Sequence, residues 1–247
     1  MRIAQVAPLY ESVPPRQYGG TELVVSYLTE ELVNQGHDVT LFASADSLTK
    51  ARLVPCAPRS LRQDPNCDDA LVHHILMLEQ VLREHQEEPF DVVHFHVDYL
   101  HFPLSRREAL PSVSTLHGRL DVPDLVPLYR EFREAPVISI SDAQRRPLPW
   151  LNWQGTVHHG LPLEHYRLSD SPGDYLAFLG RISPEKGLDQ AIRIAQISGM
   201  KLKVAAKVDR ADREYYQRLK PLLSDAGVEF LGEIGYPEKG EFLGKAA

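Results

Sequence analysis

Short apolar runs alternate along this chain with stretches whose apolar residues recur at helical spacing. Residues 175–179 form the clearest run, and an uninterrupted run of this kind indicates a strand buried on both faces of a parallel sheet. Further strands are predicted at 2–7, 38–43, 90–99, 112–118, 136–141, 202–206 and 228–231, with a short one near Leu53. This alternation predicts an α/β fold with parallel sheets.

Helices are predicted between these strands. Residues 21–35 form the first and end at Gly36, which suits a helix C-terminus. Residues 68–86 form the second, in which we expect His73 and His74 at the surface. Its buried stripe is predicted to be Leu71, Val72, Ile75, Leu78 and Leu82. Later helices are predicted after Ser183, over 211–226 and from Pro237.

A polar, proline-marked run at 162–173 separates two sets of strands and helices. Residues 1–165 and residues 173–247 are therefore predicted to form two Rossmann-like domains whose parallel sheets face a cleft. The second set has few strands, and the sequence stops without a helix cap or a further strand. We expect an incomplete second domain, a chain that is a piece of a longer protein, and oligomer formation through the exposed edge of its last strand.

Composition narrows the class of protein. The chain has 247 residues, 43% hydrophobic and 25% charged, as in an ordinary soluble globular protein. Its net charge of −7 argues against nucleic acid as a partner, because nucleic-acid-binding proteins usually carry a basic face. No apolar run is long enough to span a bilayer, and the first residues are too polar for a signal peptide. Cys56 and Cys67 lack metal-site or disulfide spacing, so we expect a cytoplasmic protein.

Positive charge gathers at the turn after the clearest apolar run. Ser183 is a good N-cap and Pro184 suits the first helical position, so a strand end and a helix start are predicted to meet there. Helix N-termini at the carboxyl ends of parallel strands favour anions. Arg181 and Lys186 would then hold a diphosphate; the alternative is that both are ordinary surface cations beside Glu185.

Two adjacent glycines mark the start of the first predicted helix. Gly19 and Gly20 carry no side chain that would keep a ligand away from the backbone at the helix N-terminus. A glycine pair also suits a plain turn, so the sequence leaves both interpretations open.

Histidines occur in two of the predicted strands. His94 and His96 alternate onto one face, which suits either a metal site with Asp98 or His101 nearby, or the lining of a cleft. The sequence has no clear second cluster of ligands, so we favour a hydrogen-bonded core position for His94, a cleft position for His96 and Asp98, and no metal. His117 ends the next strand, where ligands of parallel sheets bind, although a histidine hydrogen-bonded within a loop fits equally well.

Six of these segments follow one another in a recognisable order. They are GGTE at 19–22, DVVHFH at 91–96, TLHG at 115–118, SIS at 139–141, VHHGL at 157–161 and GRISPEKG at 180–187. The series resembles the retaining glycosyltransferases of family 4, which have the GT-B fold, over essentially the whole chain. The resemblance implies metal-independent transfer of a sugar, with retention of configuration, from a nucleotide-sugar donor such as a UDP-sugar or GDP-mannose. It implies no separate cofactor.

The resemblance also implies roles for the candidate residues. Residues 1–165 would be the acceptor-side domain and residues 173–247 the donor domain. His117 would be the catalytic residue, in contact with the sugar near its reacting carbon. Donor-binding residues would be Gly19, Gly20, Arg181, Lys186 and Lys207, and acceptor-binding residues would be His96 and Asp98. The acceptor would be an unknown glycan, lipid or small molecule, and association with a membrane surface is left open.

Other interpretations compete with this one. Family members carry a later pair of glutamates that binds the donor sugar and ribose, and because this sequence has none we expect the chain alone to be inactive. One rival is a sugar-nucleotide epimerase of the same fold, which would use carboxylate acid and base groups. A second is a non-catalytic nucleotide-binding remnant. A metal-dependent hydrolase built on His94 and His96 ranks last.

Overall fold

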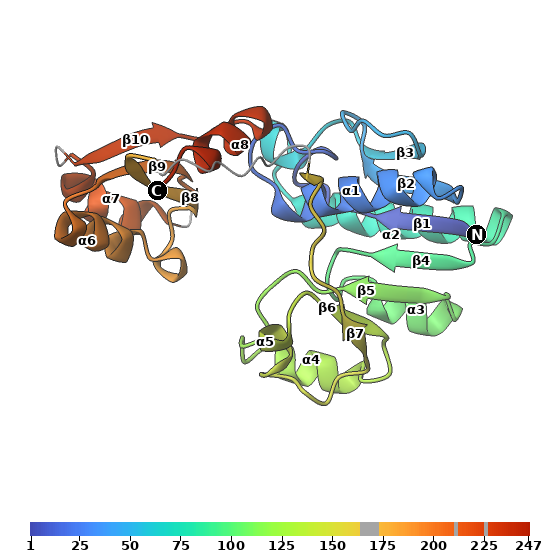
Figure 1. The fold of residues 1–247 in the computed structure, drawn as a ribbon. Coiled ribbons are helices and arrows are strands. Elements are labelled where there is room, and N and C mark those ends of the chain that lie inside the picture. The colour runs from blue at the N-terminus through green and yellow to red at the C-terminus, as the bar shows by residue number, and fades with distance from the viewer. Residues whose placement is uncertain (164–172, 210–211, 225–226) are drawn as a thin grey trace. The chain divides into compact units, whose positions relative to one another are not determined.

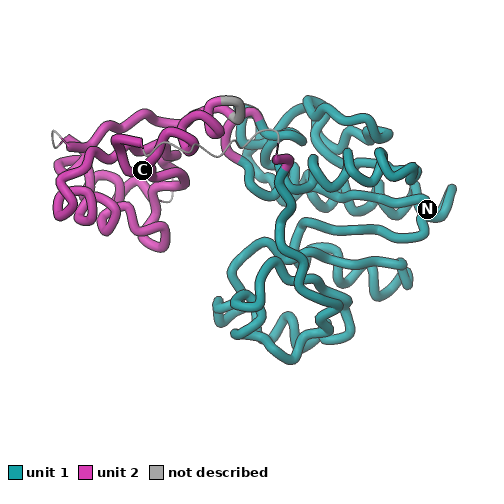
Figure 2. Tube along the Cα trace, viewed as in Figure 1, with its two compact units in different colours: residues 1–15, 19–161 teal, residues 16–18, 162–247 magenta. Residues whose placement is uncertain are grey.

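The computed structural model describes residues 1–163, 173–209, 212–224 and 227–247. Most of the linker predicted at 162–173 therefore lies outside the described residues. The chain divides into two compact units, which Figure 2 colours separately. Unit 1 comprises Met1–Pro15 and Gly19–Leu161, and unit 2 comprises Arg16–Tyr18 and Pro162–Ala247. Each unit has its own parallel sheet and its own hydrophobic core.

Unit 1 is built on a seven-stranded sheet whose neighbouring strands are all parallel (Figure 1). The strand order is β3-β2-β1-β4-β5-β6-β7. The strands are β1 (Arg2–Val6), β2 (Asp38–Ser44), β3 (Arg52–Ala57), β4 (Val92–Phe95), β5 (Ser112–Thr115), β6 (Val137–Ser139) and β7 (Trp153–Thr156). The sequence predicted all of these except β7, whose mixed composition gives no apolar run.

Helices connect most of the parallel strands of unit 1, because a parallel pair needs a crossover that a tight turn cannot supply. The exception is the pair β2 and β3, which a loop at 45–51 joins. They are α1 (Gly20–Asn34), α2 (Ala70–Glu87), α3 (Phe102–Glu108), α4 (Leu125–Glu131) and α5 (Asp142–Arg145), with a 3₁₀ turn at Leu61–Gln63. The largest core cluster packs α2 against the central strands. In the part of the chain that the structure describes, no helix combines the length and apolar character needed to cross a bilayer.

The buried face of α2 differs from the predicted stripe. Three residues of that stripe are more than half exposed, namely Leu71, Val72 and Ile75. The residues actually buried are His74, Met77, Leu78, Val81 and Leu82.

The prediction that His74 lies at the surface was wrong, since its side chain is only 2% exposed. Its Nε2 accepts a hydrogen bond from the backbone N–H of Leu9 at 3.2 Å, and its Nδ1 lies 2.7 Å from the carbonyl oxygen of Ala70. A histidine whose two nitrogens are satisfied can be buried at little cost.

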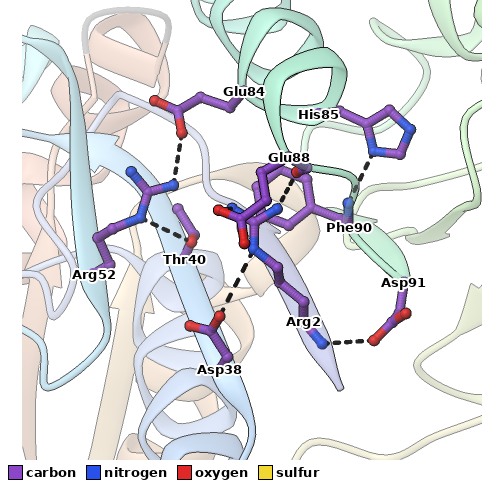
Figure 3. Close-up of polar contacts among 9 residues, drawn as sticks. All are labelled: Arg2, Asp38, Thr40, Arg52, Glu84, His85, Glu88, Phe90 and Asp91. Atoms are coloured by element: carbon purple, nitrogen blue, oxygen red, sulfur yellow. Dashed lines mark hydrogen bonds and ion pairs between the residues drawn. The ribbon is translucent and has the colours of Figure 1, made fainter.

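Charged residues close the amino-terminal edge of this sheet (Figure 3). Arg2 on β1 forms an ion pair with Glu88 at 2.8 Å and lies 3.7 Å from the carboxylate of Asp38, at the start of β2. Arg52 on β3 pairs with Glu84 of α2 at 2.6 Å. These contacts tie the strand starts to the end of α2. The opposite, carboxyl-terminal edge carries the candidate site residues.

Unit 2 carries a three-stranded parallel sheet in the order β10-β9-β8. Its elements are β8 (Tyr175–Arg181), α6 (Leu188–Ser198), β9 (Lys201–Lys207), α7 (Arg213–Leu223), β10 (Val228–Gly232) and α8 (Tyr236–Gly244). The core packs Leu188, Ile192 and Ala195 of α6 against the apolar residues of β9. The predicted α/β fold class with parallel sheets is confirmed, and the structure has one large and one small sheet.

Candidate functional site

The strand order of unit 1 indicates where a ligand site forms. From β1 the sheet continues through β2 to β3, and from β4 it continues in the opposite direction. Ligands of doubly wound sheets bind beyond the carboxyl ends of the strands at such a switch point. Gln5 of β1 and His94 of β4 are register partners close to these ends, and His96 directly follows β4.

His96 and His117 meet at this edge. The Nε2 atom of His117 lies 2.9 Å from Nδ1 of His96, and Nε2 of His96 lies 2.9 Å from Oε1 of Gln5. His96 is 3% exposed, whereas His117 is partly exposed. The ring of His159 stacks on His117 with centroids 5.3 Å apart and 20° between the ring planes. The two histidines predicted on neighbouring strand ends are thus in direct hydrogen-bond contact.

These histidines are neutral at pH 7. Burial lowers the pKa of His94 to about 4, and burial, with smaller contributions from neighbouring histidines, lowers the pKa of His117 to about 3. Burial also lowers the pKa of His96 well below its ordinary value. A neutral imidazole has one N–H donor and one acceptor nitrogen. The group is therefore suited to directional hydrogen bonds with polar hydroxyls.

Asp98 lies against the loop that carries His117. Its φ of 51° is in the left-handed region, which residues other than glycine seldom adopt. Burial raises the pKa of its carboxyl group, and the backbone N–H of His117 acts in the opposite direction. Its Oδ2 atom is 3.8 Å from where a side chain on Gly118 would begin. Asp98 is thus next to the backbone of His117.

The glycine pair lies at the N-terminus of α1. Gly19 has a φ of 149°, and a side chain there would begin 2.7 Å from Cβ of Pro15. Gly20 is the first helical residue, and no atom lies within 4 Å of its Cβ position. The carboxyl group of Glu22, in the first turn of α1, accepts hydrogen bonds from the backbone N–H groups of Glu22 and Glu11, and its Oε2 atom lies 3.1 Å from where a side chain on Gly19 would begin. The N-terminus of α1 thus already has a carboxyl group of the chain beside the glycine pair, and donor binding by Gly19 and Gly20 stays a prediction.

Three cations predicted to bind the donor gather at the carboxyl edge of the unit 2 sheet. Arg181 ends β8 and Lys207 ends β9, and these residues are register partners on adjacent strands. Lys186 lies in the exposed turn that follows β8. The guanidinium of Arg181 is held by two carboxylates, with Nη2 at 2.5 Å from Glu185 and Nε at 3.1 Å from Asp212. The arginine is thus oriented at this edge before any ligand binds.

The turn after β8 is not the direct helix start that the sequence predicted. Pro184–Lys186 form a single 3₁₀ turn, Gly187 has a left-handed φ of 69°, and α6 begins at Leu188. A residue in the left-handed region cannot continue a right-handed helix, which explains the interruption. Ser183 precedes the turn as predicted, but its side chain makes no capping hydrogen bond to any residue that the structure describes.

Two lysines of unit 2 contact the short segment Arg16–Tyr18, which belongs to the same unit. The Nζ atom of Lys207 lies 4.9 Å from the centroid of the Tyr18 ring, within the range of a cation–π interaction. The Nζ atom of Lys239 donates to the backbone carbonyl of Gln17 at 3.0 Å. Lys207 therefore has an aromatic neighbour as well as Arg181 beside it.

The structure brings the predicted site residues into separate groups. In unit 1 these are His96, Asp98 and His117 near the switch point, and the pair Gly19 and Gly20 at α1. In unit 2 they are Arg181, Lys186 and Lys207. Within the described ranges, no three or more His, Cys, Asp or Glu side chains are grouped so that they could hold a metal ion.

Sequence reasoning missed two members of the unit 1 site. Gln5 interrupts an apolar strand, and a glutamine in such a run is a signal of a buried hydrogen-bonding role. His159 lies in the segment 157–161 that was quoted for the family resemblance, but it was given no role. Its contact with His117 depends on tertiary structure that no local pattern contains.

Solved structures with the same architecture define the class. AviGT4, a glycosyltransferase involved in avilamycin A biosynthesis, matches with a TM-score of 0.69 and 23% identity, covering 100% of this chain and 67% of that chain. Sucrose-phosphate synthase from Thermosynechococcus elongatus gives a TM-score of 0.74 at 16% identity, with coverages of 100% and 74%. A Listeria monocytogenes protein described as a UDP-N-acetylglucosamine 2-epimerase gives 0.58 at 13% identity, with coverages of 100% and 72%. The fold is that of the GT-B glycosyltransferases.

The sequence itself identifies the family. The family model of Glycosyltransferase Family 4 matches residues 18–154, which is more than half of the chain. The chain therefore belongs to Glycosyltransferase Family 4. The matched range contains Gly19, Gly20, His96, Asp98 and His117 of unit 1, leaves out Gln5 and His159, and ends before the sheet of unit 2 begins. No curated protein sequence matches the chain.

Proposed function

We propose, for the whole protein, transfer of a sugar from a nucleotide-sugar donor, such as a UDP-sugar or GDP-mannose, with retention of configuration and without a metal. The 247-residue chain by itself is expected to bind the nucleotide without transferring the sugar. The observation that carries the proposal is the group of three cations in unit 2, where Arg181 and Lys207 face each other across neighbouring strands and Lys186 follows in the turn. Fixed cations of this kind suit a diphosphate, with arginine as a fork and lysine as a point charge.

The cations act on the leaving group. In the proposed reaction the bond between the anomeric carbon and the diphosphate oxygen breaks, and its electron pair stays on the phosphate. The oxygen of an acceptor hydroxyl bonds to the same carbon on the same face, and the hydroxyl proton leaves with the nucleoside diphosphate. Negative charge thus develops next to Arg181 and Lys186, where charges already in place stabilise the transition state most effectively. The anomeric carbon gains oxocarbenium character, as in glycoside cleavage.

In unit 1 we assign contact with the donor sugar to His117 and contact with the acceptor to Asp98. His117 is neutral and partly exposed, so it can exchange hydrogen bonds with hydroxyl groups. His96 takes a supporting part instead of contacting the acceptor, because its two ring nitrogens face Gln5 and His117 inside the fold. The acceptor itself is a glycan, a lipid or a small molecule.

A sugar-nucleotide epimerase is the alternative, and a protein of that description shares the fold. Such an enzyme needs carboxylate acid and base groups at the sugar. Besides the single carboxyl group of Asp98, the unit 1 site gathers histidines around a glutamine, and the family match over 18–154 favours a transferase. The second alternative is a non-catalytic nucleotide-binding protein. The calorimetric titration that tests the donor site, followed by an assay of the whole protein for release of the sugar, tests this alternative, which predicts binding without release.

Calorimetric titration of UDP, GDP, a UDP-hexose and GDP-mannose tests the proposal. We expect the chain to bind one of the two bases preferentially. The double variant Arg181→Ala/Lys186→Ala should weaken that binding by at least about a hundredfold, because each of the two lost hydrogen bonds to a charged group contributes roughly 1.5–3 kcal/mol.

Lys201→Ala is the matched control, because Lys201 begins β9 at the opposite edge of the same sheet and is exposed. This control should bind within about twofold of the parent chain, since a distant exposed charge contributes little. Equal weakening in both variants would show that general charge, not the carboxyl edge, attracts the nucleotide. Binding that survives in the double variant would refute the assigned diphosphate site.

A further inference from the structure

A continuous chain of polar contacts leads from the interior of unit 1 to His117. The contacts run from Thr115 Oγ1 to His94 Nε2 at 2.8 Å, from His94 Nδ1 to Gln5 Nε2 at 3.4 Å, and from Gln5 Oε1 to His96 Nε2 at 2.9 Å. The last contact joins His96 Nδ1 to His117 Nε2 at 2.9 Å. The residues come from three adjacent parallel strands, β1, β4 and β5, and from the loops that follow them.

Gln5 determines which group donates and which accepts at each of these contacts. A carboxamide has an oxygen that only accepts and a nitrogen that only donates. Its oxygen faces His96, so Nε2 of His96 must carry the proton and donate to Gln5. Its nitrogen faces His94, so Nδ1 of His94 must be the acceptor and its Nε2 proton goes to Thr115. One side chain therefore fixes the proton positions of two histidines.

The same reasoning extends to His117. A neutral imidazole has one N–H, so His96, having its proton on Nε2, presents a bare Nδ1. The only group with a proton to give at that contact is Nε2–H of His117. His117 then has its proton on the inner nitrogen, and its Nδ1 atom is left as an acceptor.

The other polar neighbours of His117 do not compete for the inner nitrogen. Asp98 interacts with the backbone N–H of His117. His159 contacts the ring by stacking. The burial of His94, His96 and His117 disfavours their charged forms, so each ring keeps a single proton at neutral pH.

We propose that Gln5 and His96 are positioning residues that hold His117 in the tautomer protonated at Nε2, so that its Nδ1 accepts a hydrogen bond from a hydroxyl of the donor sugar. The contact with the sugar rests on the proposed function. The tautomer is a property of the folded chain and can be measured without any ligand.

The test is ¹H–¹⁵N NMR of the full chain labelled at its histidine rings, in which the two tautomers of imidazole give distinct nitrogen shifts and couplings. Spectra of His96→Asn and His117→Gln assign the signals. We expect His117 and His96 both to be protonated at Nε2, and His94 likewise. A proton on Nδ1 of His117 in the unmodified protein overturns the inference, whatever the variants do.

Two substitutions of similar size at Gln5 sharpen the test. Gln5→Met removes the acceptor, so the ring proton of His96 is no longer held on Nε2. The single-tautomer pattern of His117 should then be lost. Gln5→Glu keeps an acceptor opposite His96, so the Nε2–H form of His117 should persist while the proton of His94 moves to Nδ1 to face the carboxylate. An unchanged His117 pattern in folded Gln5→Met would show that another group sets the tautomer and would overturn the inference.

Titration of the donor into the same labelled sample separates this inference from the proposed function. We expect the Nδ1 signal of His117 to shift with a sugar nucleotide and not with the nucleoside diphosphate alone. The expected tautomer without any binding of nucleotide would contradict the proposed function and leave the positioning of His117 standing. Binding of the donor to a chain whose His117 carries its proton on Nδ1 would overturn the positioning inference and leave the proposed function standing.

Discussion

The two units of this chain present their candidate site residues in opposite ways. In unit 1 the key groups are neutral and enclosed, with Gln5 at 1% and His96 at 3% exposure. In unit 2 they are full charges at a sheet edge, and the side chain of Arg181 remains 32% exposed although it is ion-paired. Enclosed neutral groups give hydrogen bonds a fixed direction, whereas exposed cations attract negative charge and are screened by salt.

A nucleotide sugar has one part suited to each of these environments. Its sugar carries neutral hydroxyl groups, which hydrogen bonds of fixed direction can recognise, and its diphosphate carries negative charge. The comparison also predicts that the units differ in their response to pH and substitution. A buried polar group left without its partner costs free energy, whereas an exposed charge can turn to water.

Acid should give the largest effect and should separate the units. The pKa values of His94, His101 and His117 lie at about 4, 3 and 3 in the fold, against 6.5 ordinarily. Below pH 6.5 the unfolded chain binds protons that folded unit 1 cannot, so the free energy of unfolding falls by about 1.4 kcal/mol per pH unit for each histidine, until the folded pKa is reached. The described residues of unit 2 contain no histidine.

Tryptophan fluorescence follows unit 1 alone, since Trp150 and Trp153 are the two tryptophans of the chain and both lie in that unit. We expect its transition between pH 6.5 and 4 to precede the loss of the remaining far-ultraviolet circular dichroism signal. Coincident transitions, or an unchanged fluorescence down to pH 4, would contradict the contrast between the units.

Glu22 should give the next largest effect, with the opposite dependence on pH. Burial raises the pKa of its carboxyl group from 4.5 to about 7. The contribution of the protonated carboxyl group to the free energy of unfolding is therefore fully present below pH 4.5 and is lost as the pH rises through 7. Glu22→Gln removes this loss. Chemical unfolding should show that the variant gains about 2 kcal/mol relative to the parent between pH 5.5 and pH 8. A gain that does not vary with pH would mean that Glu22 is ionised inside the fold.

A smaller effect is expected at the glycine pair. Gly19→Ala forces a side chain into a positive-φ conformation 2.7 Å from Pro15, and should cost at least about 1 kcal/mol of stability. Gly20→Ala is the matched control, because no atom lies within 4 Å of the new side chain and alanine favours helix. Thermal unfolding of both variants decides the matter, and equal midpoints would refute the strain assigned to Gly19.

The apolar pattern predicted most of the fold, because a strand buried on both faces leaves a continuous apolar run that needs no tertiary information. It failed on α2, where Leu71 and Val72 are exposed and His74 is buried. Ranking residues by polarity cannot recognise a histidine whose nitrogens are satisfied by Leu9 and Ala70. For the same reason, the apolar pattern did not reveal the buried hydrogen-bonding role of Gln5.

The candidate site was predicted in part for a similar reason. Strand ends of a parallel sheet lie at one edge, so the sequence could predict a ligand-binding position for His117 and a cleft position for His96, but not that the two side chains meet. Their hydrogen bond, and the pairing of Arg181 with Asp212 from a later element, depend on register and side-chain geometry. Gly187 interrupts the predicted helix start because its left-handed conformation is set by the turn, not by helix propensity.

Recognition of the donor sugar by His117 is the central claim of the proposed function, and one titration tests it most directly. The nucleoside diphosphate that binds best and its sugar conjugate are each titrated into the parent chain and into His117→Ala. The account predicts that the variant binds the nucleoside diphosphate as tightly as the parent and loses only the additional affinity that the sugar provides. Equal loss of both ligands, or no loss of either, would contradict it.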